Sequence, residues 1–123
     1  MIEVDIPSFG KLAISHLVLD LNGTLAQDGV LMRGVPEALS VLSRGLSIHV
    51  LTGDTFGSAR QALEGIACQF VVLGTEGQVQ AKADYVDALG ASSVASIGNG
   101  RNDRLMLMHS ALGIVVIQRE GAA

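Results

Sequence analysis

Hydrophobic and polar positions alternate at the start of the chain and then give way to short, unbroken apolar runs. Residues 1–13 alternate around turn-forming residues at 7–10, which predicts a peripheral antiparallel hairpin. The run 16–19 (HLVL) is uninterrupted, as is typical of a strand covered on both faces in a parallel sheet. We therefore expect a first core strand that ends at Asp20.

Further apolar runs follow, separated by segments with helical spacing. Strands are predicted at residues 46–51, 68–73, 94–97 and 113–117. Helices are predicted from Pro36 to a cap at Gly45, over the apolar positions 56–66, over 79–89 with a cap at Gly90, and over 103–109. Before the first helix, Asp28-Gly29 lies within an apolar stretch at 25–32 and predicts a small hairpin flap.

Strands that alternate with short helices predict repeated βαβ units, and therefore an α/β fold with three layers and a parallel five-stranded sheet. We expect residues 1–123 to form one domain, in which the hairpin at 1–13 precedes a core at 14–117. Residues 118–123 are expected to form a loose tail.

Composition narrows the classes of function. The chain has 123 residues, a single cysteine, few aromatic residues and a net charge of −4. Because its basic residues are scattered, we expect no nucleic-acid partner. No apolar stretch approaches the ~20 residues that span a bilayer, and the N-terminus lacks the features of a signal peptide. We expect no membrane partner and a cytoplasmic location.

Polar residues follow the ends of three predicted strands, and a lysine lies early in the third helix. They are Asp20, Asn22, Thr24, Thr52, Lys82, Asn99, Asn102 and Asp103. Because the carboxyl ends of parallel strands open at one edge of a sheet, these residues should converge.

This set has the parts that phosphoryl transfer needs. It includes a carboxylate that can act as a nucleophile, a lysine that balances charge, and oxygen ligands for Mg²⁺. Hydroxyl groups and glycine-loop amides can bind the phosphoryl group. The phosphate-binding residues predicted here are Gly23, Thr24, Thr52, Gly53, Lys82 and Asn102. The residues by themselves thus predict an aspartyl-phosphate site at Asp20.

Four motifs in order also resemble the haloacid-dehalogenase superfamily over about residues 14–117. VLDLNGTL is similar to its first motif, and LTGDTFGSARQAL to its second in the form found in P-type ATPases. Lys82 corresponds to the third motif, and SIGNGRNDRLML is similar to the fourth. The small soluble P-type-ATPase-like proteins look nearest, since they too lack membrane helices and a nucleotide-binding insert.

The resemblance implies a strand order of 5-4-1-2-3 and no cap domain. It implies that Asp20 is the phosphorylated nucleophile and that Thr52 and Lys82 hold the phosphoryl oxygens. The implied cofactor is Mg²⁺, bound by Asp20, the backbone carbonyl of Asn22, Asn99 and Asp103.

Two positions depart from the superfamily pattern. Many of its phosphatases have Asp as a general acid and base where this chain has Asn22, and loss of such a group slows a reaction roughly 10²- to 10⁴-fold. Asn22 therefore predicts slow dephosphorylation. Asn99 replaces a metal-binding Asp, so Mg²⁺ affinity should be reduced.

The predicted function is a Mg²⁺-dependent phosphatase or phosphoryl-transfer hydrolase acting on a phosphorylated substrate. The alternative is a catalytically weak phosphate-binding module with a regulatory or assembly role. A phospho-acceptor receiver domain would carry its acceptor after the third strand, which this chain does not. Because no cap encloses the site, we expect a large substrate or a second copy in a homo-oligomer to close it. His16, His49 and His109 are expected to be structural, and Met106 and Met108 to be core or helix-packing residues.

Overall fold

The computed structural model describes residues 1–27, 30–53 and 57–117. Its centre is a parallel five-stranded sheet of order β7-β6-β3-β8-β9. The strands are β3 (His16–Asp20), β6 (Ser47–Thr52), β7 (Cys68–Val72), β8 (Val94–Gly98) and β9 (Leu112–Val115). The predicted order 5-4-1-2-3 is confirmed, with the first core strand in the middle.

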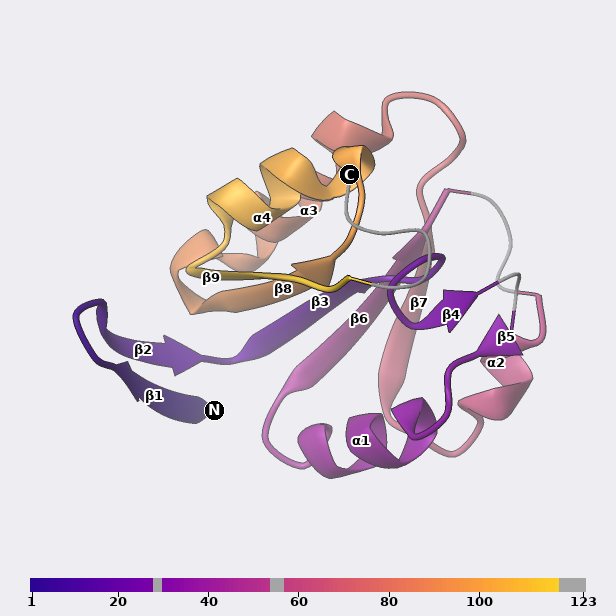
Figure 1. Ribbon diagram of the computed structural model, residues 1–123, viewed down its shortest axis with the longest axis horizontal. Coiled ribbons are helices and arrows are strands. Elements are labelled where there is room, and N and C mark those ends of the chain that lie inside the picture. Colours follow the sequence, from indigo (N-terminus) through magenta and orange to yellow (C-terminus); the bar gives the residue numbers. More distant parts are fainter. Residues whose placement is uncertain (28–29, 54–56, 118–123) are drawn as a thin grey trace.

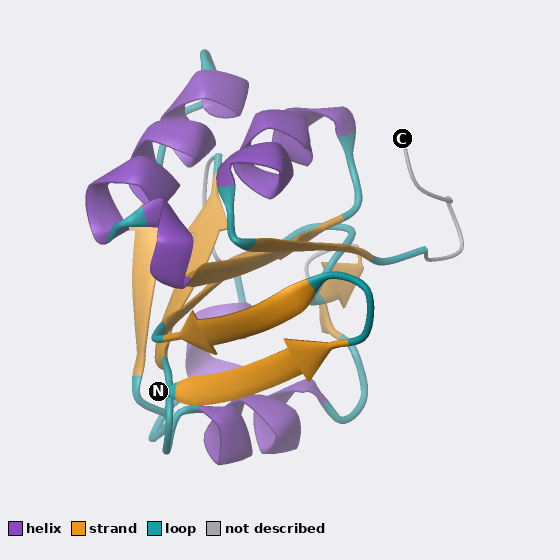
Figure 2. Ribbon diagram, turned by 90° about the vertical axis from the view of Figure 1, so that its left-hand side faces the viewer, coloured by secondary structure: helices purple, strands orange, loops and turns teal. Residues whose placement is uncertain are grey.

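Helices cover both faces of this sheet, which gives three layers (Figures 1 and 2). One face carries α3 (Gln78–Leu89) and α4 (Arg104–His109), and the other carries α1 (Val35–Leu42) and α2 (Ala59–Ala62). Two short 3₁₀ turns, η1 (Ala91–Ser93) and η2 (Arg101–Asp103), flank β8. Among the described residues, no helix is long and apolar enough to cross a membrane.

The apolar run of β3 is explained by burial on both faces. Val18 belongs to the cluster beneath α3 and α4, together with Val86 and Met106. Leu17 and Leu19 point the other way and pack in the larger cluster on the side of α1 and α2. Because successive strand residues face opposite sides of a sheet, an unbroken apolar run suits a central strand.

Two antiparallel hairpins accompany the sheet. β1 (Ile2–Ile6) pairs with β2 (Gly10–Ile14) in the predicted N-terminal hairpin. β4 (Ala26–Gln27) pairs with β5 (Val30–Leu31), which forms the predicted flap. The turn predicted at 28–29 and the tail predicted at 118–123 lie outside the described residues.

Helix boundaries differ from the predictions at two places. α2 is a single turn that ends before Gly65, whose φ of +88° stops the helical path, and position 56 lies outside the described residues. Gly45 is not the cap of α1: the helix ends at Leu42, and its capping residue, Ser43, has right-handed geometry, so no left-handed residue is needed there. Gly90 does cap α3, with a φ of +99°.

Candidate active site

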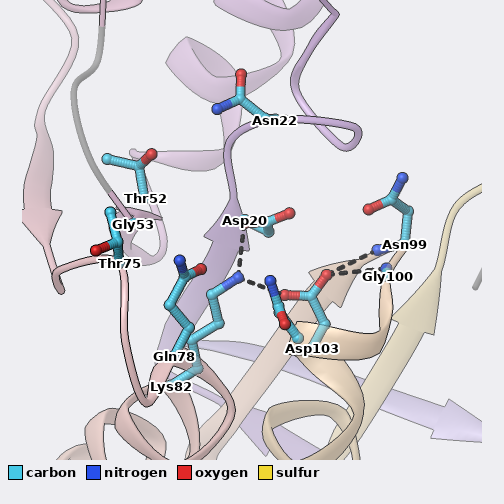
Figure 3. A pocket seen from close by; sticks show the side chains of 11 residues that line it. Asp20, Asn22, Thr52, Gly53, Thr75, Gln78, Lys82, Asn99, Gly100 and Asp103 are labelled. Atoms are coloured by element: carbon cyan, nitrogen blue, oxygen red, sulfur yellow. Dashed lines mark hydrogen bonds and ion pairs between the residues drawn. The ribbon is translucent and has the colours of Figure 1, made fainter.

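A pocket of about 420 Å³ opens at the sheet edge where β3 and β6 end (Figure 3). It brings together most of the residues predicted from the sequence. They are Asp20, Asn22, Thr52, Gly53, Lys82, Asn99, Asn102 and Asp103. The pocket also includes Thr75, Gln78 and Gly100, which the sequence did not single out.

Two carboxylates and one lysine form the base of the pocket. Lys82 Nζ donates to Asp20 Oδ1 at 2.8 Å and to Asp103 Oδ1 at 2.7 Å. The side chains of Lys82 and Asp103 are 2% and 1% exposed, whereas that of Asp20 is 13% exposed. Asp20 is therefore the member of the group that a ligand can reach.

The environment of Asp20 changes its acidity. Burial and the negative charge of Asp103 raise the pKa of Asp20 to about 6, although Lys82 acts in the opposite direction. Burial alone would lower the pKa of Lys82, but the charge of Asp20 and the hydrogen bonds to both carboxylates raise it. Lys82 thus stays charged, and Asp20 is ionised at neutral pH.

The loop after β8 is organised by Asp103. Its Oδ2 accepts hydrogen bonds from the backbone N–H groups of Asn99 at 3.0 Å and Gly100 at 3.1 Å. Gly98 makes this possible, since a Cβ there would lie 2.5 Å from the Asp103 Cγ. Asp103 therefore ties the fourth motif to Lys82 on α3.

The loop after β3 turns tightly around one carbonyl group. The Leu21 carbonyl accepts from the N–H groups of Leu25 and Ala26, both at 2.9 Å. Gly23 has a φ of +82°, and a Cβ on it would lie 2.9 Å from the Asn99 Cγ, so the first and fourth loops meet here. This turn leaves Gly23 and the buried Thr24 out of the pocket lining, so the structure does not bring these two predicted phosphate-binding residues to the site.

Thr75 and Gln78 reach the pocket from the segment between β7 and α3. Gln78 is the first residue of α3, four positions before Lys82, so the two share a helix face. The spacing of four residues from Lys82 is the sequence feature that could have identified Gln78 as a pocket residue. Thr75 lies in the loop after β7, where no motif marks it.

The three histidines lie outside the pocket lining. His49 Nε2 is 3.1 Å from His16 Nδ1, and His49 Nδ1 is 2.8 Å from the Tyr85 hydroxyl. Burial and the neighbouring His16 lower the pKa of His49. His109 pairs with Asp87 at 3.1 Å. These contacts agree with the structural role predicted for them.

The donor set suits a hard cation. The Asp20 carboxylate, the Asn22 carbonyl and the Asn99 amide offer oxygen atoms, the ligands that Mg²⁺ prefers. Both oxygens of the buried Asp103 already accept hydrogen bonds, so Asp103 would have to give one up to join them. Asp20, Asp103 and Lys82 together leave one net negative charge, which a cation would neutralise. In the described part of the chain, no three His, Cys, Asp or Glu side chains gather in a metal-binding group. Any cation here would therefore need amide, carbonyl or water oxygens in addition to the carboxylates.

Solved structures share this fold at low sequence identity. The 3-deoxy-D-manno-octulosonate 8-phosphate phosphatase of Moraxella catarrhalis, with magnesium, phosphate and its sugar, matches with a TM-score of 0.62 and 19% identity over 89% of this chain and 70% of that chain. The cobalt-bound enzyme of Haemophilus influenzae matches with a TM-score of 0.59 and 20% identity over 85% of this chain and 70% of that one. A protein of Legionella pneumophila, assigned to the haloacid-dehalogenase superfamily (subfamily III A) as a hydrolase, matches with a TM-score of 0.56 and 16% identity over 89% of this chain and 70% of that one. The fold is that of the haloacid-dehalogenase superfamily.

No protein-family model matches the sequence. A relative is found in Methanocaldococcus jannaschii, the uncharacterized protein MJ0072, which is 46% identical over 39 residues. Those residues make up 32% of this chain and 89% of the relative. The chain belongs to the same family as MJ0072.

Proposed function

We propose that this protein is a Mg²⁺-dependent phosphohydrolase or phosphoryl-transfer enzyme that forms an aspartyl-phosphate on Asp20. The observation that carries the proposal is the state of the Asp20 carboxylate. One oxygen is held by Lys82 at 2.8 Å, and the side chain is the partly exposed member of an otherwise buried ion group. The phosphatases with the same fold support this choice of chemistry.

In the first step, an oxygen of Asp20 attacks phosphorus, a new P–O bond forms, and the bond to the leaving alkoxide breaks. Thr52 and Lys82 stabilise the peripheral phosphoryl oxygens, whose charge must be balanced during transfer. Asp20, the Asn22 carbonyl, Asn99 and Asp103 would hold Mg²⁺, which supplies charge neutralisation when bound. The leaving oxygen takes its proton from water, because the Asn22 amide is too weak an acid to supply one.

In the second step, water attacks phosphorus and Asp20 leaves as a carboxylate, so that inorganic phosphate is released. Deprotonation of the water needs a base, and the Asn22 amide cannot act as one. Phosphorylation of Asp20 is therefore expected to be faster than its hydrolysis, and a phosphorylated form should accumulate.

The test compares wild type with Asp20→Asn and, as a matched control, Asp5→Asn at an exposed position of β1. Wild type and the control are expected to hydrolyse an aryl phosphate with Mg²⁺, and to melt at a higher temperature with beryllium fluoride and Mg²⁺. Asp20→Asn should lose both responses. If wild type is as inert as Asp20→Asn and gains no thermal stability, the proposal is wrong.

A second candidate is a phosphate-binding module with little turnover. It is favoured by Asn22 and Asn99, which supply neither a base nor a metal-binding charge. This alternative predicts that beryllium fluoride with Mg²⁺ raises the melting temperature, and that the protein does not release inorganic phosphate repeatedly from an aryl phosphate.

A further inference from the structure

Gln78 occupies a position in the pocket that the four motifs do not explain. It begins α3, and its side chain lines the pocket four residues before Lys82. Figure 3 shows its amide beside the Lys82 amine, on the same side of the pocket as Thr52 and Gly53. Gln78 therefore faces the place where the phosphoryl oxygens would be held.

The Gln78 amide packs directly against the second motif. A Cβ on Gly53 would collide with the Gln78 Nε2 and lie 2.6 Å from its Cδ, so a side chain at position 53 would have to push the Gln78 amide aside. By contrast, the next glutamine of the helix, Gln80, is exposed and donates to Asp84 at 2.8 Å. The two glutamines differ in place although they lie on the same helix.

Lys82 has a single N–H donor left for a phosphoryl group. An ammonium group has three N–H donors, and two of them are used by Asp20 and Asp103. The positive charge is also offset by these two carboxylates. One donor remains, so a neighbouring neutral donor would complete the contacts to the phosphoryl oxygens.

We infer that Gln78 is a third phosphoryl-binding residue, beside Thr52 and Lys82. Its side-chain NH₂ group donates a hydrogen bond to a phosphoryl oxygen of the substrate and of the phosphorylated Asp20. The inference rests on the proposed function, because it assigns a role at the same site. It adds a residue from the start of α3 to those that the motifs identify.

The test measures binding of inorganic phosphate with Mg²⁺, and thermal stabilisation by beryllium fluoride with Mg²⁺. Gln78→Ala should weaken phosphate binding about 10-fold, since a hydrogen bond to a charged group is lost. Gln78→Glu should weaken it about 100-fold, because a carboxylate offers no N–H and repels the anion. Gln80→Glu makes the same change of charge on the same helix and should bind phosphate as wild type does.

The same variants also provide a control for loss of folding. A carboxylate near a helix N-terminus is favourable, so Gln78→Glu without ligand should melt no lower than wild type. A purely structural role for Gln78 predicts the reverse pattern, with the melting temperature changed and phosphate binding retained.

Gly53→Ala provides a second route to the same side chain. Its new methyl group should displace the Gln78 amide and weaken phosphate binding about 10-fold. In a Gln78→Ala background the same substitution should cost less than twofold, because the amide is already absent.

The inference is wrong if wild type binds phosphate and both Gln78 variants bind it within twofold of wild type. A wild type that responds to neither probe overturns the proposed function, and this inference with it.

Discussion

The ionisation of Asp20 links the stability of the protein to its chemistry. Its side chain is 13% exposed and forms an ion group with Lys82 and Asp103. A nucleophile must be ionised to attack phosphorus, yet burial and Asp103 favour its protonated form. The raised pKa, about 6, still leaves Asp20 charged at neutral pH.

This pKa predicts how stability depends on pH. Because the pKa of Asp20 rises from 3.8 to about 6 on folding, the folded protein binds a proton more readily between these values. The stabilisation that Asp20 contributes is full below the lower value and is lost as the pH rises through the higher one. In the Asp20→Asn variant the side chain at position 20 does not titrate. As the pH rises from about 4 to about 7, the free energy of unfolding of this variant should therefore increase relative to that of wild type, by on the order of 2 kcal/mol.

Urea unfolding of both proteins at a series of pH values measures this difference. Added Mg²⁺ should reduce it, since a bound cation favours the ionised carboxylate. A difference in unfolding free energy that stays constant across the range would contradict the prediction.

Asn22 gives the second prediction at the residue scale. It is exposed and lies at the outer side of the pocket (Figure 3), where an acid could exchange protons with water. Asn22→Asp should therefore speed hydrolysis of the phosphorylated protein by roughly 10-fold or more. The measurement is release of inorganic phosphate per protein over time. Asn22→Asp combined with Asp20→Asn should stay inactive, and unchanged turnover in the single variant would count against the predicted role.

At the scale of elements, α3 connects the core to the site. Its first residue, Gln78, and its fifth, Lys82, reach the pocket, while Val86 further along is fully buried in the cluster beneath α3 and α4. Packing of one half of the helix thus fixes the direction of Lys82. A glycine at each end, Gly77 and Gly90, adopts the left-handed geometry that stops the helix.

The two methionines of α4 form a matched pair. Met106 is fully buried and packs with Val18 and Val86, as predicted. Met108 was also predicted to be a core or helix-packing residue, and this is wrong: it is 76% exposed. Residues two positions apart on a helix are separated by about 200° around its axis, so Met108 faces away from the sheet.

Met106→Ala should lower the free energy of unfolding by about 2 to 5 kcal/mol, because it leaves a cavity beneath α4. Met108→Ala should change it by less than about 0.5 kcal/mol. Equilibrium unfolding in urea compares the two variants with wild type. Equal destabilisation by both would show that α4 does not pack as described.

At the scale of the whole molecule, the pocket lies open at one edge of the sheet. Between β3 and α1 the described residues form turns and the short β4–β5 flap, and between β7 and α3 they form a loop at 73–77. Neither segment encloses a small substrate. A second copy of the chain or a large phosphorylated substrate is therefore expected to close the site.

This assembly is tested by light scattering together with turnover at increasing protein concentration. We expect a mass above that of a single 12.7 kDa chain, or activity restricted to large phosphorylated substrates. A monomer that hydrolyses small phosphate esters efficiently would contradict the expectation.

The convergence of the site could be predicted because parallel strands share one edge. Asp20 and Thr52 are the last residues of their strands and Asn99 follows β8, so the sheet order alone brings them together. Gln78 could not be placed in this way, since its contact with Gly53 depends on how α3 packs across the end of β6. The order of the strands also does not predict the position of Thr24, because the turn after β3 takes this residue out of the pocket lining.

The sequence by itself determined the order of elements, the parallel sheet and the residue types available for phosphoryl transfer. Periodicity and strand-end polarity are local properties, and they are readable without the fold. Only the tertiary structure decided that Lys82 is shared by Asp20 and Asp103, because residues 62 and 21 positions away meet its amine. That sharing sets the charge, the exposure and the raised pKa of Asp20, all of which depend on surroundings that come together only on folding.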